Sequence, residues 1–231
     1  MASLASDPGL HPLVPYFTQL IAEEVQRSLA DLPRLHLLLQ AAAALLANEH
    51  LDLERYLHQL MPAALTCCVA RRLGASPADD HWAVRRRAAG LVAVACGRFG
   101  GAYENLQPRV TRQLLRALLD PGLPLTTHYG AVVGLAALGP RVVRLLLLPH
   151  AVAYCAALAP VLAPTPPGQG PAPRAAEAAR VYDALAAAAA AAVADLARAW
   201  RPLGDCFELR EVFGDALLPY APEPPIAGLF L

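Results

Sequence analysis

The chain has 231 residues, a formal net charge of zero, 56% hydrophobic residues and 16% charged residues. A protein without net charge has no overall electrostatic attraction to nucleic acid or to an anionic membrane. Its charged fraction is below the typical value of about 25%, for which two explanations stay open: outer faces that meet other proteins, and an alanine-biased genome. All nineteen basic residues are arginine, which indicates a biased codon pool.

Prolines and apolar segments repeat along the chain with a nearly constant interval. The prolines that accompany successive apolar stretches are Pro15, Pro62, Pro108 and Pro149. Second apolar segments begin near Arg34, Trp82, Thr126 and Arg174. An interval of about 40 to 47 residues with two helices per repeat is typical of HEAT and armadillo arrays. The pattern therefore predicts an all-α HEAT-repeat α-solenoid of about four to five helix pairs, in which each pair buries its apolar face against the next.

Helical spacing of the apolar residues predicts the individual helices in chain order. They are expected at 12–29, 32–46, 53–73, 76–99, 105–119, 126–138, 141–158 and 174–200. Asp31 should cap the second helix, Gly74 should end the third in a left-handed conformation, and Ser76-Pro77 should open the fourth. Pro149 should kink the helix in which it lies, because it removes a backbone hydrogen bond.

The domain organisation follows from the same pattern. We expect a flexible N-terminal tail at 1–10, one HEAT-repeat domain at 11–201 with a Pro-rich internal linker at 159–173, and a C-terminal tail at 202–231 with a short helix near 208–218. The stretch after 218 is expected to be disordered. No apolar run is expected to reach the roughly 18 to 20 residues that span a bilayer, and the first residues do not have the pattern of a secretory signal.

The polar residues do not point to a catalytic, cofactor-binding or metal site. Cys67 and Cys68 are adjacent, so their side chains diverge by about 100° on a helix and cannot chelate one ion together. The five cysteines are expected to be mostly buried thiols in a reducing compartment, which is nuclear or cytosolic. The cluster Asp79-Asp80-His81 has two interpretations, helix capping and acid–base catalysis, of which capping is favoured. An enzyme is therefore the least favoured class of protein.

Five arginines are the candidate partner-binding residues: Arg71, Arg72, Arg85, Arg86 and Arg87. The first two should end the third helix, where a cation complements the helix dipole. The other three are consecutive and sweep about 200° of a helix, so they cannot all face one way. Three interpretations stay open, in order of preference: a solvated surface, a contact with a protein partner, and a contact with nucleic acid.

Four ordered strings make a specific resemblance visible: LVPYFTQLIAEEV (13–25), YLHQLMPAALTC (56–67), DDHWAVRR (79–86) and HYGAVVGLAALGPRVVRLLLLP (128–149). They resemble the HEAT-repeat domain of subunit 6 of the general transcription factor TFIID, a TBP-associated factor, and the green-plant form most of all. The resemblance covers about residues 11 to 200, with a poor match in the linker.

The chain departs from this family in two respects. The family's HW-x-L-R-D string has Arg86 at its acidic position here, so any contact that relies on a carboxylate there is in doubt. Nothing in the chain resembles the N-terminal histone fold of the family, and we expect histone-fold pairing to be missing from this chain.

The resemblance implies a nuclear, non-catalytic scaffold of TFIID, and of a SAGA-type coactivator, that supports assembly of the RNA polymerase II pre-initiation complex. Its implied partners are other TBP-associated factors or SAGA subunits, and self-association stays open. It implies no cofactor. The alternative is a HEAT-repeat adaptor with an arginine-lined nucleic-acid-binding face, although direct nucleic-acid binding is not favoured.

Six residues of the matching strings form a structural signature: Pro62, His81, Trp82, Tyr129, Gly130 and Gly134. Trp82 lies on the stripe of Ala89, Val92, Cys96 and Phe99 and should anchor the core of the second repeat. The two glycines beside Tyr129 should let their helix approach a neighbouring helix closely. His81, like His58, is expected to form ordinary hydrogen bonds and not to bind a ligand.

Overall fold

A computed structural model describes residues 2–76, 78–101, 105–163, 172–198 and 213. The chain divides into two compact units, Met1–Leu138 and Gly139–Leu231. The boundary falls inside the single domain that was expected at 11–201, at the break formed by Gly139 and Pro140. The expected disorder after residue 218, most of the expected helix near 208–218 and the linker at 164–171 lie outside the described residues.

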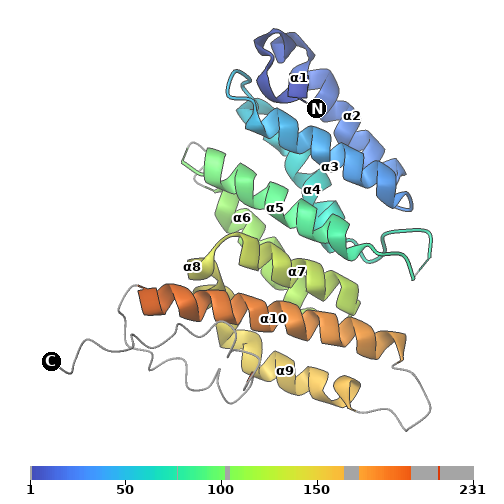
Figure 1. Ribbon diagram of the computed structural model, residues 1–231, viewed down its shortest axis with the longest axis vertical. Helices are drawn as coiled ribbons and strands as arrows, with labels where there is room; N and C mark the ends of the chain where they lie inside the picture. Colours follow the sequence, from blue (N-terminus) through green and yellow to red (C-terminus); the bar gives the residue numbers. More distant parts are fainter. Residues whose placement is uncertain (1, 77, 102–104, 164–171, 199–212, 214–231) are drawn as a thin grey trace, which may run out of the picture. The chain divides into compact units, whose positions relative to one another are not determined.

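The first unit contains three successive helix pairs (Figure 1). The pairs are α2 (Val14–Arg27) with α3 (Leu32–Ala47), α4 (Leu57–Val69) with α5 (Trp82–Phe99), and α6 (Leu106–Leu119) with α7 (Leu125–Ala137). Helices α3, α5 and α7 pack side by side in that order, and α2 packs on α4 in the other layer. This arrangement confirms the all-α HEAT-repeat architecture.

Helix starts and turns follow local sequence signals in several places. Asp31 Oδ1 accepts a hydrogen bond from Arg34 N at 3.0 Å, so Asp31 caps α3 as predicted. Gly74 has a φ of +86°, and its N–H donates to the Leu29 carbonyl at 2.9 Å. Pro15 lies in the first turn of α2, where its missing N–H costs nothing. Pro62 instead lies inside α4, on an exposed face.

The second helix pair is shorter than the sequence predicts. Helix α4 begins at Leu57, after a 3-10 turn at Glu54–Tyr56, and ends at Val69 instead of residue 73. Helix α5 begins at Trp82 instead of residue 76. Asp79 does not cap it, because its carboxylate accepts from Ser76 N at 2.9 Å within the connecting loop. The predicted capping role of the Asp79-Asp80-His81 cluster is therefore wrong in detail.

The first residues are helical, where a flexible tail was expected. Helix α1 (Ala2–Ser6) is followed by the 3-10 helix η1 (Pro8–Leu13), and α1 packs on α3. The fully buried Asn48 side chain holds this segment, because its Nδ2 donates to the carbonyls of Leu4 and Asp7 at 3.1 Å each. The anchoring residue is 41 to 44 positions away, which the local pattern cannot show.

Helix α5 supplies arginines to the ends of two neighbouring helices. Arg98 donates to the carbonyls of Leu46 and Asn48 at the end of α3. Arg85 donates to carbonyls at the end of α4. The last carbonyls of a helix have no partner within it, and these arginines donate to them from a neighbouring helix.

The second unit contains a further helix pair. One helix runs through α8 (Pro140–Val142), a π-helical segment (η3, Val143–Leu147) and α9 (Leu148–Leu162), and it packs on α10 (Pro173–Arg198). The π-helical turn ends at Leu147, two residues before Pro149, at which the sequence predicts a kink. An ion pair joins Arg144 Nη1 to Asp195 at 2.6 Å. Phe213, at the expected short helix, is buried with its ring 5.6 Å from that of Tyr182 in α10.

The helix over Pro140–Leu162 is longer and more apolar than the sequence analysis predicts. It has 23 residues and contains an 18-residue window with a mean hydropathy of 1.9, so by length and composition it could cross a membrane. The sequence expectation that no apolar run reaches this length is therefore wrong. The same helix also continues four residues past 158, into the stretch that was assigned to the linker.

Candidate partner-binding surface

Arg85 lies inside the protein, at a junction of α4, α5 and α7. Its side chain is fully buried. Nη1 donates to the Cys68 carbonyl at 2.9 Å, Nη2 donates to the Ala70 carbonyl at 2.8 Å, and Nε donates to His81 Nδ1 at 3.2 Å. These bonds require a neutral His81 whose Nδ1 carries no proton. Arg85 is thus a structural residue, and its placement removes it from the candidate partner-binding set.

The sequence contains a signal for this burial. The stripe that buries Trp82, Ala89, Val92 and Cys96 passes through position 85 at helical spacing. A charged side chain is almost never fully buried unless it is paired, and the acceptors that pair it lie on a different helix. The helical periodicity therefore predicts that Arg85 is buried, whereas its charge predicts that it is exposed. The structure agrees with the periodicity.

Two glycines of α7 allow close packing at this junction, as the sequence predicts. A Cβ on Gly130 would lie 1.8 Å from the Cys68 carbonyl oxygen, and one on Gly134 would lie 3.0 Å from the Leu114 side chain. Cys68 Sγ donates to the Gly130 carbonyl at 3.1 Å. The backbones of α4 and α7 therefore meet at Gly130, where only glycine fits.

The carbonyls at the end of α4 are also satisfied from α7. Thr126 Oγ1 donates to the Arg71 carbonyl at 3.1 Å, and Thr127 Oγ1 donates to the Ala70 carbonyl at 3.2 Å. Together with Arg85, these bonds satisfy the backbone where α4 ends. The carbonyls that follow the last residue of α4, Val69, thus have donors from α7.

An aromatic cluster lies beside the junction. The rings of Trp82 and Tyr129 make an edge-to-face contact with centroids 4.7 Å apart, and the His81 ring lies 4.3 Å from that of Trp82. Trp82, His81 and Tyr129 are buried, as packing inside the first unit requires. Arg86, at the position where the family pattern has an acid, donates to the Tyr129 hydroxyl at 3.0 Å.

The remaining candidate arginines are exposed and lie in two places. Arg71 and Arg72 follow the end of α4, and Arg72 donates to the Ala75 carbonyl. Arg86 and Arg87 lie in the second turn of α5. The structure thus leaves four of the five predicted residues on the surface.

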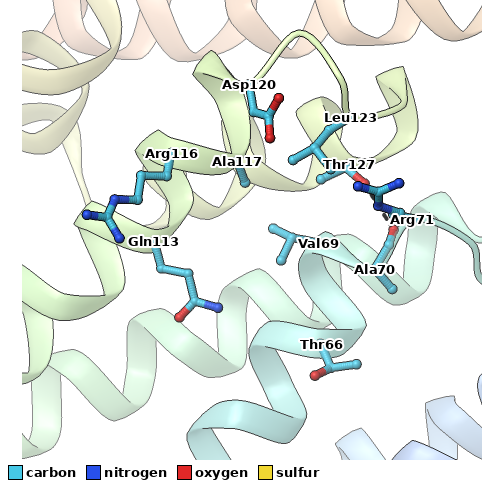
Figure 2. Close-up of a pocket in the computed structure, with 10 residues that line it drawn as sticks. All are labelled: Thr66, Val69, Ala70, Arg71, Gln113, Arg116, Ala117, Asp120, Leu123 and Thr127. Carbon is cyan, nitrogen blue, oxygen red and sulfur yellow. Dashed lines mark hydrogen bonds between the residues drawn. The ribbon is translucent and has the colours of Figure 1, made fainter.

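A groove of about 440 Å³ lies beside Arg71, where α4 faces α6 and the start of α7. Figure 2 shows Arg71 and Arg116 on opposite sides of this groove, with Val69 and Ala117 between them. The remaining lining residues are Thr66, Ala70, Gln113, Asp120, Leu123 and Thr127. The predicted site residues include Arg71 but not the α6 residues of this groove.

The thiols are not disposed for chemistry. Burial raises the pKa of Cys67 and Cys68 to about 12, although the nearby Arg85 cation opposes the shift. Burial likewise raises the pKa of Cys96 and Cys155 to about 11. These four thiols stay protonated at neutral pH, whereas a nucleophile or metal ligand must be a thiolate. Among the residues that the structure describes, no three His, Cys, Asp or Glu side chains are grouped to hold a metal ion.

Comparisons with known proteins agree with this fold. The family described as "TAF6 C-terminal HEAT repeat domain" matches residues 1–152. The chain is 54% identical over 162 residues to transcription initiation factor TFIID subunit 6 of Arabidopsis thaliana. It is 46% identical over 155 residues to the SAGA complex/transcription factor TFIID complex subunit Taf6 of Schizosaccharomyces pombe.

The matched regions are parts of longer proteins. They cover 70% and 67% of this chain but only 30% of the Arabidopsis protein and 34% of the S. pombe protein. The solved TAF6 C-terminal domain from Antonospora locustae superimposes with a TM-score of 0.61 at 31% sequence identity, over 66% of this chain and 75% of that structure. The chain therefore belongs to the family of TAF6 C-terminal HEAT repeat domains.

Proposed function

We propose that this chain is a non-catalytic scaffold subunit of the general transcription factor TFIID, and of a SAGA-type coactivator, acting in the nucleus. In this role it supports assembly of the RNA polymerase II pre-initiation complex through contacts with other TBP-associated factors or SAGA subunits. The observation that carries the proposal is the 54% identity to TFIID subunit 6, which extends over 70% of this chain. The proposal includes a SAGA-type coactivator because the name of the S. pombe relative includes the SAGA complex.

The described structure supports a scaffold role in physical terms. Polar groups inside the first unit are used for helix-to-helix bonds, as at Arg85 and Asn48. The surface, by contrast, carries large exposed apolar side chains, among them Tyr16 (71% exposed) and Leu37 (58% exposed). Apolar side chains on a rigid helical layer are suited to extended protein interfaces.

The alternative is an arginine-lined nucleic-acid-binding face. Four exposed arginines (Arg71, Arg72, Arg86 and Arg87) favour it, while the buried Arg85 no longer contributes. Such a face would lose affinity steeply as salt rises, because phosphate contacts release counterions. A protein-docking surface with an apolar component would be much less salt-dependent.

Affinity purification of the tagged 231-residue chain from nuclear extract, followed by mass spectrometry, tests the proposal. We expect enrichment of TFIID or SAGA subunits over a tag-only control, including after nuclease treatment. Reversing Arg71, Arg72 and Arg87 to Glu reports whether these arginines contribute. An Arg55→Glu variant is the control, because Arg55 is exposed on a different part of the surface. Recovery of nucleic acid without these subunits would refute the scaffold proposal.

A further inference from the structure

Helix α6 carries a ridge of arginines on one exposed face, formed by Arg109, Arg112 and Arg116 (the α6 arginine ridge). Their i, i+3, i+7 spacing places them within about 60° of one another around the helix axis. All three are exposed, while Val110, Leu114 and Leu118 are buried on the opposite face. The helix contains no Asp or Glu, so nothing within it neutralises the ridge.

The ridge is also unpaired with neighbouring elements. Within the described residues, none of its three arginines makes an ion pair, whereas Arg27, Arg34 and Arg55 elsewhere in the first unit each pair with a carboxylate. Like charges one and two turns apart on a helix repel each other and destabilise it slightly. A zero-charge protein that gathers uncompensated cations on one helix face offers a binding site for an external negative charge.

The groove beside the ridge adds an apolar component. Arg116 and Gln113 project from α6 at one side of it, and Arg71 lies at the other (Figure 2). Between them, Val69, Ala117 and Leu123 give an apolar lining. The ridge therefore continues into a groove in which apolar surface lies between two cations.

We propose that the α6 arginine ridge and this groove bind an acidic segment of a partner protein. Its carboxylates would pair with Arg109, Arg112, Arg116 and Arg71, and an apolar side chain of the segment would enter the groove. Arginine presents a planar fork of donors that matches a carboxylate. An apolar side chain seated between two such pairs excludes water from them, which strengthens the pairing.

The groove is less suited to a nucleic acid. None of its lining residues is aromatic. Single-stranded nucleic acids rely on aromatic platforms for stacking in addition to cations. An acidic and apolar peptide uses both the cations and the apolar lining.

The inference rests on the proposed role in protein docking and narrows it to a surface and a partner chemistry. A direct binding assay tests it with a defined probe: a fluorescein-labelled 14-residue peptide of Asp, Glu, Leu and Phe, and its counterpart in which Asn and Gln replace the acids. Fluorescence anisotropy with the intact 231-residue chain gives the dissociation constants. We expect the acidic peptide to bind at least tenfold more tightly than its amide counterpart.

Two variants of the ridge and one charge-matched control locate the site. Reversing Arg109, Arg112 and Arg116 to Glu should weaken binding of the acidic peptide at least tenfold, and changing the same three residues to Gln should weaken it several-fold. Reversing Arg27, Arg34 and Arg55 to Glu changes the net charge equally at exposed positions of the first unit that lie outside α6 and the groove, and should weaken binding less than twofold. Circular dichroism verifies that each variant is folded.

Three results would overturn the inference: equal weakening in the ridge and control variants, equal binding of the amide peptide, or tighter binding of a 20-base-pair DNA duplex through the same ridge. The nuclear-extract purification, repeated with the ridge variant, separates this inference from the proposed function. If TFIID subunits are recovered but the peptide does not bind the ridge, only the inference fails. If the peptide binds but no TFIID or SAGA subunit is recovered, the proposed function fails.

Discussion

The guanidinium of Arg85 in α5 donates to the Cys68 carbonyl in α4 at 2.9 Å, inside the protein. The same carbonyl oxygen is the atom that a Cβ on Gly130 of α7 would meet. A single backbone group thus connects three helices of the first unit. Loss of the Arg85 donor, or a larger side chain at Gly130, should therefore disturb all three helices.

Replacement of Arg85 by Met should destabilise the chain strongly. The variant keeps an aliphatic side chain of comparable length but removes the donor to the Cys68 carbonyl and to His81 Nδ1, while Thr127 still donates to the Ala70 carbonyl. Each unsatisfied buried polar group costs about 1 to 3 kcal/mol, so we expect a loss of roughly 3 kcal/mol in the free energy of unfolding. Urea denaturation followed by circular dichroism measures it.

Arg87→Met is the matched control, because Arg87 is exposed two residues along the same helix. A surface substitution of this kind should change stability by no more than about 0.5 kcal/mol. Equal effects of the two variants would contradict the structural role of Arg85.

Two glycine-to-alanine variants should have opposite effects. A Cβ at Gly130 would lie 1.8 Å from a backbone oxygen, which forces α4 and α7 apart and should cost about 2 kcal/mol or more. Gly90 lies exposed in α5, and a Cβ there would meet nothing within 4 Å, so alanine at this position should stabilise the helix by about 0.5 to 1 kcal/mol. Thermal denaturation of both variants measures the difference, and a stabilised Gly130→Ala would refute the close approach.

The buried thiols predict a loss of stability at alkaline pH. Burial raises the pKa of Cys67 and Cys68 to about 12, above the value of about 8.5 for an unfolded chain. The folded state therefore favours the protonated thiols. Their contribution is fully present below pH 8.5 and declines as pH rises toward 12, by at most about 1.4 kcal/mol per thiol per pH unit.

Unfolding midpoints measured between pH 8 and pH 11 test this dependence. The double variant in which Ala replaces Cys67 and Cys68 should show a shallower decline over the same interval. An unchanged slope in the variant would assign the alkaline sensitivity to other groups.

Asn48→Ala should release the N-terminal helices from the first unit. The variant loses both bonds from Nδ2 to the carbonyls of Leu4 and Asp7, at a cost of about 1 to 2 kcal/mol. Hydrogen exchange of the amides in residues 2–13 should accelerate, while exchange in α5 stays unchanged. Asn105→Ala provides the control, since Asn105 is exposed and its side chain makes no capping bond. Slow exchange retained in residues 2–13 of Asn48→Ala would show that packing alone holds them.

The fold was predictable to the extent that it depends on local patterns. The apolar spacing gave the order of the helices, and Asp31 gave the start of α3 correctly, because a cap is satisfied within three residues. The boundaries of α4 and α5 were not predictable. The end of α4 accepts hydrogen bonds from Thr126 and Thr127 of α7 and from Arg85 of α5. Asp79, which was expected at the start of α5, instead accepts from Ser76 N in the preceding loop.

The candidate site was predictable only in part for the same reason. A run of consecutive arginines, such as the one at 85–87, is conspicuous in the sequence, but one of its members is inside the protein. The α6 arginine ridge is less conspicuous, although its i, i+3, i+7 spacing is legible in the sequence. The sequence does not show that Arg71 lies near this ridge. Arg71 and Arg116 are 45 residues apart, and only the fold brings both to one groove.

A domain exchange in S. pombe tests the proposed scaffold role most directly. Residues 1–152, which match the family, would replace the corresponding segment of the S. pombe relative, and incorporation of the chimera into TFIID and SAGA would be measured by quantitative mass spectrometry of the purified complexes. We expect incorporation close to that of the unmodified subunit, and strongly reduced incorporation for a chimera with Gly130→Ala. A chimera that is folded and as abundant as the unmodified subunit but absent from both complexes would contradict this role.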